Sequence, residues 1–356
     1  MQTSSYEFLK RLLDAPGPSG FETAAARVWR HEAQGFADSV NVDVAGNSAA
    51  TLGSGAPRVM LAGHVDEIGV MITHVDDEGF LYIDGIGGWD PQVLVGQRIR
   101  FLTRLGPVVG VVGKTPIHLM KQEEKEKAVK LQDLWVDIGA SDRAAALERG
   151  IRVGDPGVVD APLLELGSGL IASRAVDNRI GAFVVLEVLR ALSTGERPAA
   201  QVFAVATTQE EIGYHGGGAR TSAFALEPSV AVAVDLTFST CAPGIEKKQV
   251  GEHKLGSGPV LSRGSAIHPL VFERLAETAE QEGIPFTIQA SPRFTSTDAD
   301  AIYLQRAGVA TGVVSIPNRY MHSPNEVVAL DDIDATVRLL AAFCRGLRDG
   351  DEFIPI

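Results

Sequence analysis

The hydrophobic positions of this chain follow two periods. Within residues 4–14 the apolar side chains, from Phe8 to Leu13, recur three to four positions apart, which predicts an amphipathic helix. Residues 59–62 instead form a short unbroken apolar run, which is typical of a strand buried on both faces of a parallel sheet. Similar runs occur at 202–206, 230–234 and 309–315. Helical periods predict further helices at 22–32, 180–192, 268–282, 298–306 and 331–347.

A different pattern separates the first apolar run from the later ones. Residues 69–112 contain short alternating runs divided by turn signals such as Asp76-Asp77-Glu78-Gly79, and they predict a small β-barrel. We therefore expect an α/β protein with a mixed, mostly parallel sheet flanked by helices and an inserted small barrel-like domain. The expected division places one domain at 1–67 and 162–356 and the β-rich insert at 68–161.

Acidic and histidine side chains lie where the buried strands are expected to end. They are His64 and Asp66 after the run at 59–62, Glu210 and Glu211 after that at 202–206, Asp235 after that at 230–234, and Asp177 and His322 in predicted loops. Open α/β sheets place their ligands at the carboxyl ends of the strands. We therefore expect these side chains to meet at one edge of the sheet.

The residue types in this set favour a catalytic metal site. Carboxylates and imidazoles are hard or borderline ligands for zinc and similar divalent ions, and no cysteine joins them, so a structural zinc knot is disfavoured. Two ions held close together need a carboxylate between them, end ligands on each ion, and a free carboxylate beside the reacting water. The set supplies a candidate for each position, which indicates metal-assisted hydrolysis.

The composition of the chain limits the kinds of partner and the cellular compartment that we expect. With 356 residues, of which 45% are hydrophobic and 22% charged, the chain has the composition of a globular protein, and its formal net charge of −13 disfavours a nucleic-acid surface. Cys241 and Cys344 are the only cysteines, so we expect a reducing compartment and no disulfide framework. No signal peptide is predicted at the start and no apolar run reaches transmembrane length. The expected address is therefore the cytoplasm, without a membrane partner.

A series of short motifs resembles one known family. The motifs are His64-Val65-Asp66-Glu67-Ile68-Gly69, Ala175-Val176-Asp177-Asn178-Arg179, Thr208-Gln209-Glu210-Glu211-Ile212-Gly213, Val234-Asp235, Ser296-Thr297-Asp298-Ala299 and Arg319-Tyr320-Met321-His322-Ser323. Their order resembles that of the tetrahedral aminopeptidases, metallopeptidase family forty-two, which also contains glutamyl aminopeptidases and proteins labelled as cellulase M. The similarity covers essentially the whole chain. It implies a zinc-peptidase-like α/β fold and an enzyme that removes residues from the amino ends of peptides.

The resemblance also implies roles for individual residues. Asp177 would bridge two divalent ions, Zn²⁺ or Co²⁺. His64 and Asp235 would complete the shell of one ion, and Glu211 and His322 that of the other. Glu210 would be the general base. Asp66 would accept the second ring N–H of His64 and so fix its tautomer.

Backbone geometry and assembly are implied in the same way. The resembling enzymes have a cis peptide bond after the bridging aspartate, so we expect a cis bond between Asp177 and Asn178. The family forms dimers through the inserted domain and commonly joins six dimers in a hollow shell. We therefore expect at least a dimer and favour the twelve-subunit shell.

Other interpretations of the same residues stay open. A glycosidase would use two carboxylates that flank a sugar and would need no histidine ligands. A non-catalytic peptide-binding protein that has kept the fold is another alternative. Arg263 and Arg293 either line a pocket for acidic substrate side chains or are ordinary surface charges.

Overall fold

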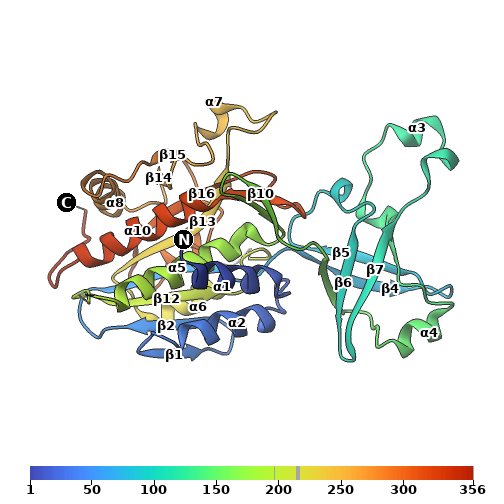
Figure 1. Ribbon diagram of the computed structural model, residues 1–356, viewed down its shortest axis with the longest axis horizontal. Coiled ribbons are helices and arrows are strands. Elements are labelled where there is room, and N and C mark those ends of the chain that lie inside the picture. Colours follow the sequence, from blue (N-terminus) through green and yellow to red (C-terminus); the bar gives the residue numbers. More distant parts are fainter. Residues whose placement is uncertain (196, 214–216, 356) are drawn as a thin grey trace.

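The main body of the molecule is an eight-stranded sheet with helices on both faces (Figure 1). The computed structural model describes residues 1–195, 197–213 and 217–355. The strand order is β1-β2-β12-β3-β13-β16-β14-β15. In this order the strands span Ser39–Val42, Ser48–Leu52, Gln201–Thr207, Arg58–His64, Val230–Phe238, Ala310–Asn318, Val260–Gly264 and Thr287–Ser291.

The four central strands, β12, β3, β13 and β16, run parallel to one another. They contain the apolar runs seen in the sequence: every residue of β3 after Arg58 is buried, as is every residue of β13 before Phe238. Antiparallel neighbours, β2 and β14, flank this group. The predicted mixed and mostly parallel sheet is confirmed, and the carboxyl ends of its central strands open at one common edge.

The helices form two layers around the sheet. They are α1 (Thr3–Asp14), α2 (Thr23–Ala33), α5 (Val176–Ser193), α6 (Gly217–Leu226), α8 (Pro269–Gln281), α9 (Ala299–Ile302) and α10 (Leu330–Gly346). In β3, Val59 and Leu61 belong to the large core under α1, α2, α5, α8 and α10. Met60 and Ala62 belong to the smaller core under α6 and α9. This alternation follows from the two-residue period of a strand that is covered on both faces.

Helix α5 packs unusually closely on β3. A Cβ atom on Gly63 would lie 2.4 Å from the carbonyl carbon of Gly181, so the two backbones can touch only because residue 63 has no side chain. Gly63 precedes the last residue of β3, and Gly181 lies in the first half of α5. This close approach brings the start of α5 beside the carboxyl end of β3.

A closed six-stranded barrel stands apart from the sheet (Figure 1). Its strands are β4 (Gly69–Val75), β5 (Leu81–Ile86), β6 (Arg98–Thr103), β7 (Gly106–Gly113), β8 (Trp135–Asp137) and β9 (Pro156–Val159). The short helices α3 (Gln122–Lys125) and α4 (Arg143–Glu148) lie in its connections. The barrel has a core of its own, which includes Ile72, Phe101 and Val136. The predicted barrel is thus confirmed, while domain boundaries at 68 and 161 remain a proposal.

The chain enters the barrel directly after β3 and returns to the main body through β10 (Leu164–Gly167) and β11 (Leu170–Ser173). These two strands form a small antiparallel sheet with β17 (Glu326–Ala329). A short helix, α7 (Lys247–Val250), lies in the segment after β13. Among the described residues, no helix is both long and apolar enough to cross a membrane.

The structure differs from the sequence prediction at several elements. Strand β13 continues to Phe238, so Asp235 lies within the strand and not after its end. The helix predicted at 298–306 is only the short α9, and the chain turns at Arg306, which has a positive φ of 52°. Helix α6 was not predicted because its first residues are glycines, which have poor helix propensity.

Candidate metal centre

The predicted site residues converge at the carboxyl edge of the central strands. His64 ends β3, Asp235 lies in β13, Glu210 and Glu211 follow β12, Asp177 lies in the first turn of α5, and His322 follows β16. The parallel register pairs Thr207, the last residue of β12, with His64. The segment that carries the two glutamates therefore starts at the level of the histidine.

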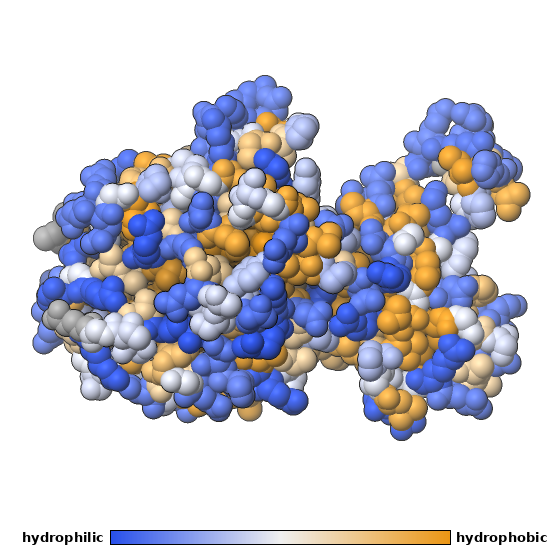
Figure 2. All heavy atoms as spheres, viewed as in Figure 1, coloured by the Kyte–Doolittle hydropathy of each residue, from blue (hydrophilic) through white to orange (hydrophobic). Residues whose placement is uncertain are grey.

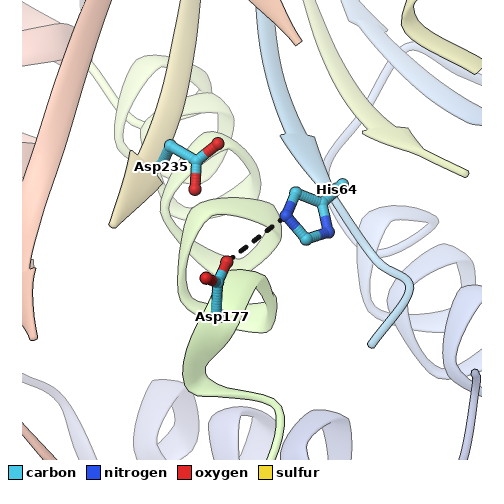
Figure 3. A group of neighbouring side chains, drawn as sticks. All are labelled: His64, Asp177 and Asp235. Carbon is cyan, nitrogen blue, oxygen red and sulfur yellow. Dashed lines mark ion pairs between the residues drawn. The ribbon is translucent and has the colours of Figure 1, made fainter. Parts of the chain in front are cut away.

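One group of potential ligands consists of His64, Asp177 and Asp235 (Figure 3). One ligand atom of each residue lies within 4.8 Å of those of the other two, and all three residues are buried. His64 Nε2 is 3.3 Å from Asp177 Oδ1. Figure 3 shows the three side chains approaching one space from β3, α5 and β13. A nitrogen and two carboxylates around one space could hold a divalent cation.

A second group consists of Asp177, Glu211 and His322, whose ligand atoms also lie within 4.8 Å of one another. His322 Nε2 is 3.3 Å from Glu211 Oε2 and 3.7 Å from Asp177 Oδ2. This group is more open than the first, because the His322 side chain is 35% exposed and that of His64 only 2%. Asp177 belongs to both groups and presents a different oxygen to each histidine.

The Asp66 side chain lies behind the first ligand group and contacts both His64 and the segment that contains Glu210 and Glu211. Its Oδ1 lies 3.3 Å from His64 Nδ1, on the side of the ring away from Asp177. Its carboxylate also accepts the backbone N–H of Glu210 at 3.2 Å and that of Glu211 at 3.1 Å. One buried carboxylate thus contacts the histidine ring and holds the peptide segment of both glutamates.

The two neighbouring glutamates occupy different environments. Glu211 is 5% exposed at its side chain and faces His322. Glu210 is 19% exposed, and its Oε2 lies 3.8 Å from His64 Nε2. Neither of the two ligand groups found among the described residues includes Glu210. The chain therefore places one closed carboxylate in a ligand group and one more open carboxylate beside it.

The site holds more negative charge than its buried position favours. Burial raises the pKa of Glu210 and of Asp235 well above their usual values, and Asp177 adds to the rise at Asp235. Burial lowers the pKa of His322, but Glu211 and Asp177 outweigh this effect and raise that pKa to about 9. Bound cations would relieve this conflict, so the oxygen and nitrogen donors present here fit divalent metal ions.

Several backbone conformations at the site are unusual. The non-glycine residues Ala175, Gln209 and His322 have positive φ angles of 58°, 61° and 58°. Such conformations are costly and persist only where the surroundings fix them, and they cluster at functional sites. The peptide bond between Asp177 and Asn178 is cis, as predicted.

Glu326 was not identified from the sequence, although it holds two of the site residues. It is buried in β17 and accepts the backbone N–H of Asp177 at 2.9 Å and that of His322 at 2.8 Å. Burial and the neighbouring Asp177 raise its pKa well above the usual value. A single glutamate in a polar stretch gives no periodic signal, so only the fold reveals this contact.

The turn after α1 contributes two further residues that sequence reasoning missed. Ser19 donates its hydroxyl hydrogen bond to Asp66 Oδ2 at 2.5 Å. Glu22 accepts the backbone N–H of Gln209 at 3.1 Å. In the sequence this turn is visible only as a proline- and glycine-rich helix break.

Asp298 lies behind the end of β12. It is only 4% exposed, its Oδ2 accepts the hydroxyl hydrogen of Thr207, and its Oδ1 has no hydrogen-bond partner in the described part of the chain. Burial raises its pKa to about 6. Asp298 thus adds a buried acid beside the two ligand groups.

The two arginines considered for substrate recognition lie on the surface. Arg263 in β14 pairs with Glu273 at 3.4 Å and stacks over the ring of Phe272, both of α8. This packing favours a surface charge over a pocket residue. Arg293 is exposed in the segment after β15.

Comparison with known proteins identifies the family of this chain. Residues 46–339 match the family model for M42 glutamyl aminopeptidases. A lysyl aminopeptidase from Pyrococcus furiosus is 39% identical over 353 residues, which cover 98% of this chain and 99% of the relative. The crystal structure of a TET aminopeptidase from Thaumarchaeota archaeon SCGC AB-539-E09 matches with a TM-score of 0.92 and 34% identity, covering 97% of this chain and 96% of the other.

A TET1 peptidase from Pyrococcus horikoshii, described as able to assemble into a tetrahedron or a large octahedral shell, matches with a TM-score of 0.84 and 31% identity. The match covers 96% of this chain and all of that chain. The family model spans most of the sequence, and the relatives align over nearly its whole length. The chain therefore belongs to the M42 glutamyl aminopeptidase family and is a metal-dependent aminopeptidase.

Proposed function

We propose that the protein removes residues from the amino ends of peptides by means of two divalent ions held on either side of Asp177. The observation that carries this proposal is the position of the Asp177 carboxylate. Its Oδ1 lies 3.3 Å from His64 Nε2, and its Oδ2 lies 3.7 Å from His322 Nε2. A carboxylate that gives one oxygen to each of two ligand groups is suited to bridge two ions.

The remaining ligands follow from the two groups. His64 and Asp235 would complete the first ion's shell, and Glu211 and His322 the second ion's shell. Imidazole and carboxylate ligands suit Zn²⁺ and Co²⁺, which are the ions that we propose. Asp66 would orient His64 through the contact with Nδ1, which leaves Nε2 directed at the first ion.

The bound ions would lower the pKa of a water molecule in the site and polarise the scissile carbonyl group. Glu210 would accept a proton from that water and pass it to the leaving amine. Its partial exposure, its position 3.8 Å from His64 and its absence from both ligand groups support this role. A free substrate amine would coordinate a metal ion or pair with a nearby carboxylate, which would favour cleavage at the amino end.

A glycosidase mechanism does not account for this site. It requires two carboxylates on opposite sides of a sugar and no histidine, whereas here His64 and His322 lie within contact distance of the shared carboxylate. A purely peptide-binding role gives no function to the open carboxylate of Glu210.

We further propose that the protein assembles through its barrel into at least a dimer, and that it favours the twelve-subunit shell. Figure 2 shows apolar side chains gathered on the barrel end of the molecule. The exposed apolar side chains of the barrel include Val109 and Val111 of β7, which are 47% and 50% exposed, and Ile117 and Leu119 in the following segment, which are 56% and 77% exposed. Cys241 and Cys344 are unpaired, which fits a reducing compartment such as the cytoplasm.

Metal replacement tests the proposed function. The protein is treated with EDTA, reloaded with Zn²⁺ or Co²⁺, and analysed for bound metal and for hydrolysis of an aminoacyl anilide. We expect two ions per chain at full activity. Full activity with a single ion per chain would overturn the two-ion proposal.

A further inference from the structure

The barrel contacts the metal centre through the turn that follows β5. The turn after β5 contains Gly87 and Gly88, and the Gly88 carbonyl oxygen lies 2.9 Å from His322 Nδ1. A Cβ atom on Gly88 would lie 3.4 Å from the same nitrogen, and one on Gly87 would lie 3.4 Å from Glu211 Cβ. A segment of the barrel therefore packs directly against two residues of the more open ligand group.

This contact determines which nitrogen of His322 is available. A carbonyl oxygen can only accept, so Nδ1 carries the hydrogen in this bond. Nε2 is then the nitrogen left to face Glu211 and Asp177, at 3.3 Å and 3.7 Å. Hydrogen bonds to the far nitrogen of a ligating histidine fix its tautomer and ring orientation.

A buried ionic cluster holds the barrel in this position. Glu67 lies where the chain leaves the main body for the barrel, and Arg174 lies just after β11, where it has returned. Glu67 pairs with Arg174 and, at 2.9 Å, with Arg179 of α5. The three side chains are 3%, 5% and 0% exposed. The cluster thus ties both connections of the barrel to the helix that carries Asp177.

The turn after β5 is also hydrogen-bonded to the start of the barrel. Trp89 Nε1 donates to the carbonyl oxygen of Gly69, the first residue of β4, at 2.6 Å. Gly69 follows Glu67 closely in the chain, so the turn is fixed to the same connection that the cluster holds. The position of the Gly88 carbonyl is therefore determined by the barrel and its connections.

We propose that the barrel is a working part of the metal centre: the Gly88 carbonyl orients His322, and the Glu67–Arg174–Arg179 cluster holds the barrel where that carbonyl reaches the ring. The inference rests on the proposed function, because it takes His322 as a metal ligand. His64 is instead oriented by Asp66, from the same strand end. Disturbing the barrel contact should therefore weaken the binding of the ion at His322 and leave the binding of the ion at His64 unchanged.

Cobalt titration of the ion-free protein tests this selectivity. Gly87→Ala strains the turn, because Gly87 has a positive φ of 78° and an added Cβ would lie 2.7 Å from Ile68 Cγ2, whereas the control Gly96→Ala has a similar φ of 79° but meets no atom within 4 Å. Binding of each Co²⁺ is followed by visible absorption and calorimetry. We expect Gly87→Ala to shift the Gly88 carbonyl and to weaken the binding of one of the two ions roughly 10-fold to 100-fold, and we expect Gly96→Ala to weaken the binding of neither.

Two outcomes contradict different parts of the account. If the wild type binds two ions and Gly87→Ala binds both with unchanged affinity, the inference is overturned while the proposed function stands. If the wild type binds only one ion, the proposed function fails and the inference fails with it. The titration therefore separates the two.

A second variant tests the cluster. Glu67→Gln keeps the shape of the side chain but removes the charge that faces the two arginines. We expect the same selective loss at the His322 ion, with an unchanged circular dichroism spectrum. If the affinities for both ions fall equally, or if neither affinity changes, the cluster does not act through the barrel. Should Glu67→Gln fail to fold, Gly87→Ala still decides the contact at His322.

Discussion

Two buried carboxylates that are not in the ligand groups organise most of the site at the residue scale. Asp66 contacts His64 and holds the segment of Glu210 and Glu211 through their backbone N–H groups. Glu326 does the same for Asp177 and His322. Fixing ligands through buried acceptors lowers the cost of ordering them when a metal ion binds.

Changing each of the two adjacent glutamates to glutamine should have different effects on metal content and on kcat. Glu210→Gln removes the proposed base and should lower kcat roughly 100-fold to 10,000-fold with normal metal content. Glu211→Gln weakens a proposed ligand and should lose metal first. Metal analysis beside kinetics checks both. An empty Glu210→Gln protein with a fully loaded but inactive Glu211→Gln protein would reverse the assignments, and two normally active variants would remove both residues from the mechanism.

The pKa of His322, about 9 in the ion-free protein against 6.5 ordinarily, predicts a pH dependence. Because this pKa is raised by folding, its contribution to stability is fully present below pH 6.5 and is lost as the pH rises to 9. Urea unfolding of the ion-free wild type, compared with His322→Gln, should show this loss in the wild type alone. Parallel curves for the two proteins would contradict it.

The same proton should oppose metal binding. An ion at His322 must displace the proton from Nε2, so its affinity should rise from pH 6.5 to 9, by up to about tenfold per pH unit. Calorimetry of Co²⁺ binding in buffers of different ionisation enthalpy measures the protons released. An affinity that does not change over this range would mean that His322 is not a ligand.

At the residue scale, the site residues that lie in sequence motifs could be predicted from the sequence. Those that contact the site only because of the fold could not. His64 and Asp235 follow recognisable apolar runs and Asp177 lies in a motif, and the structure brings the three together. Ser19 and Glu326 touch the site through hydrogen bonds that no spacing along the chain reveals. The roles given to all these residues are proposals.

At the scale of elements, the contact between β3 and α5 sets the distance between His64 and Asp177. Both backbones approach at Gly63 and Gly181, and the small residue is required on the strand. The buried strands were predictable because a short unbroken apolar run is typical of a strand covered on both faces. Strand β14 and helix α6 were missed because the first is short and the second starts with glycines, so packing rather than local pattern decides their structure.

Gly63→Ala tests this contact. The added Cβ would meet backbone atoms of α5 at 2.4 Å, which cannot move aside as a side chain can. We expect the free energy of unfolding of the ion-free protein to fall by about 1–3 kcal/mol or more, measured by urea denaturation. Gly346→Ala, whose Cβ meets nothing within 4 Å, should change it by less than about 0.5 kcal/mol. Equal stability of the two variants would contradict the close packing.

At the scale of the whole molecule, the barrel combines two tasks. It presents exposed valines on β7 and it places Gly88 against His322. The insertion itself was predictable, because the apolar period changes sharply after Asp66. Its contact with the metal centre was not, because Gly88 and His322 are 234 positions apart and neither neighbourhood signals the other.

The proposed assembly through the barrel is tested by adding charge to β7. Val109→Glu with Val111→Glu should dissociate the protein toward monomers, because a charge buried in an apolar interface is costly. Light scattering of the metal-loaded protein measures its mass. Val44→Glu, at a fully exposed position outside the barrel, serves as the control and should leave the mass unchanged. A wild type that is itself a monomer would contradict the assembly proposal.

Degradation of one peptide with a free amino end and of the same peptide with an acetylated amino end tests the central claim most directly. The EDTA-treated protein should leave both intact. After Zn²⁺ or Co²⁺ is restored, mass spectrometry should show residues lost one after another from the free amino end, while the acetylated peptide stays whole. Cleavage that persists in EDTA, or internal cleavage of the acetylated peptide, would contradict a metal-dependent aminopeptidase.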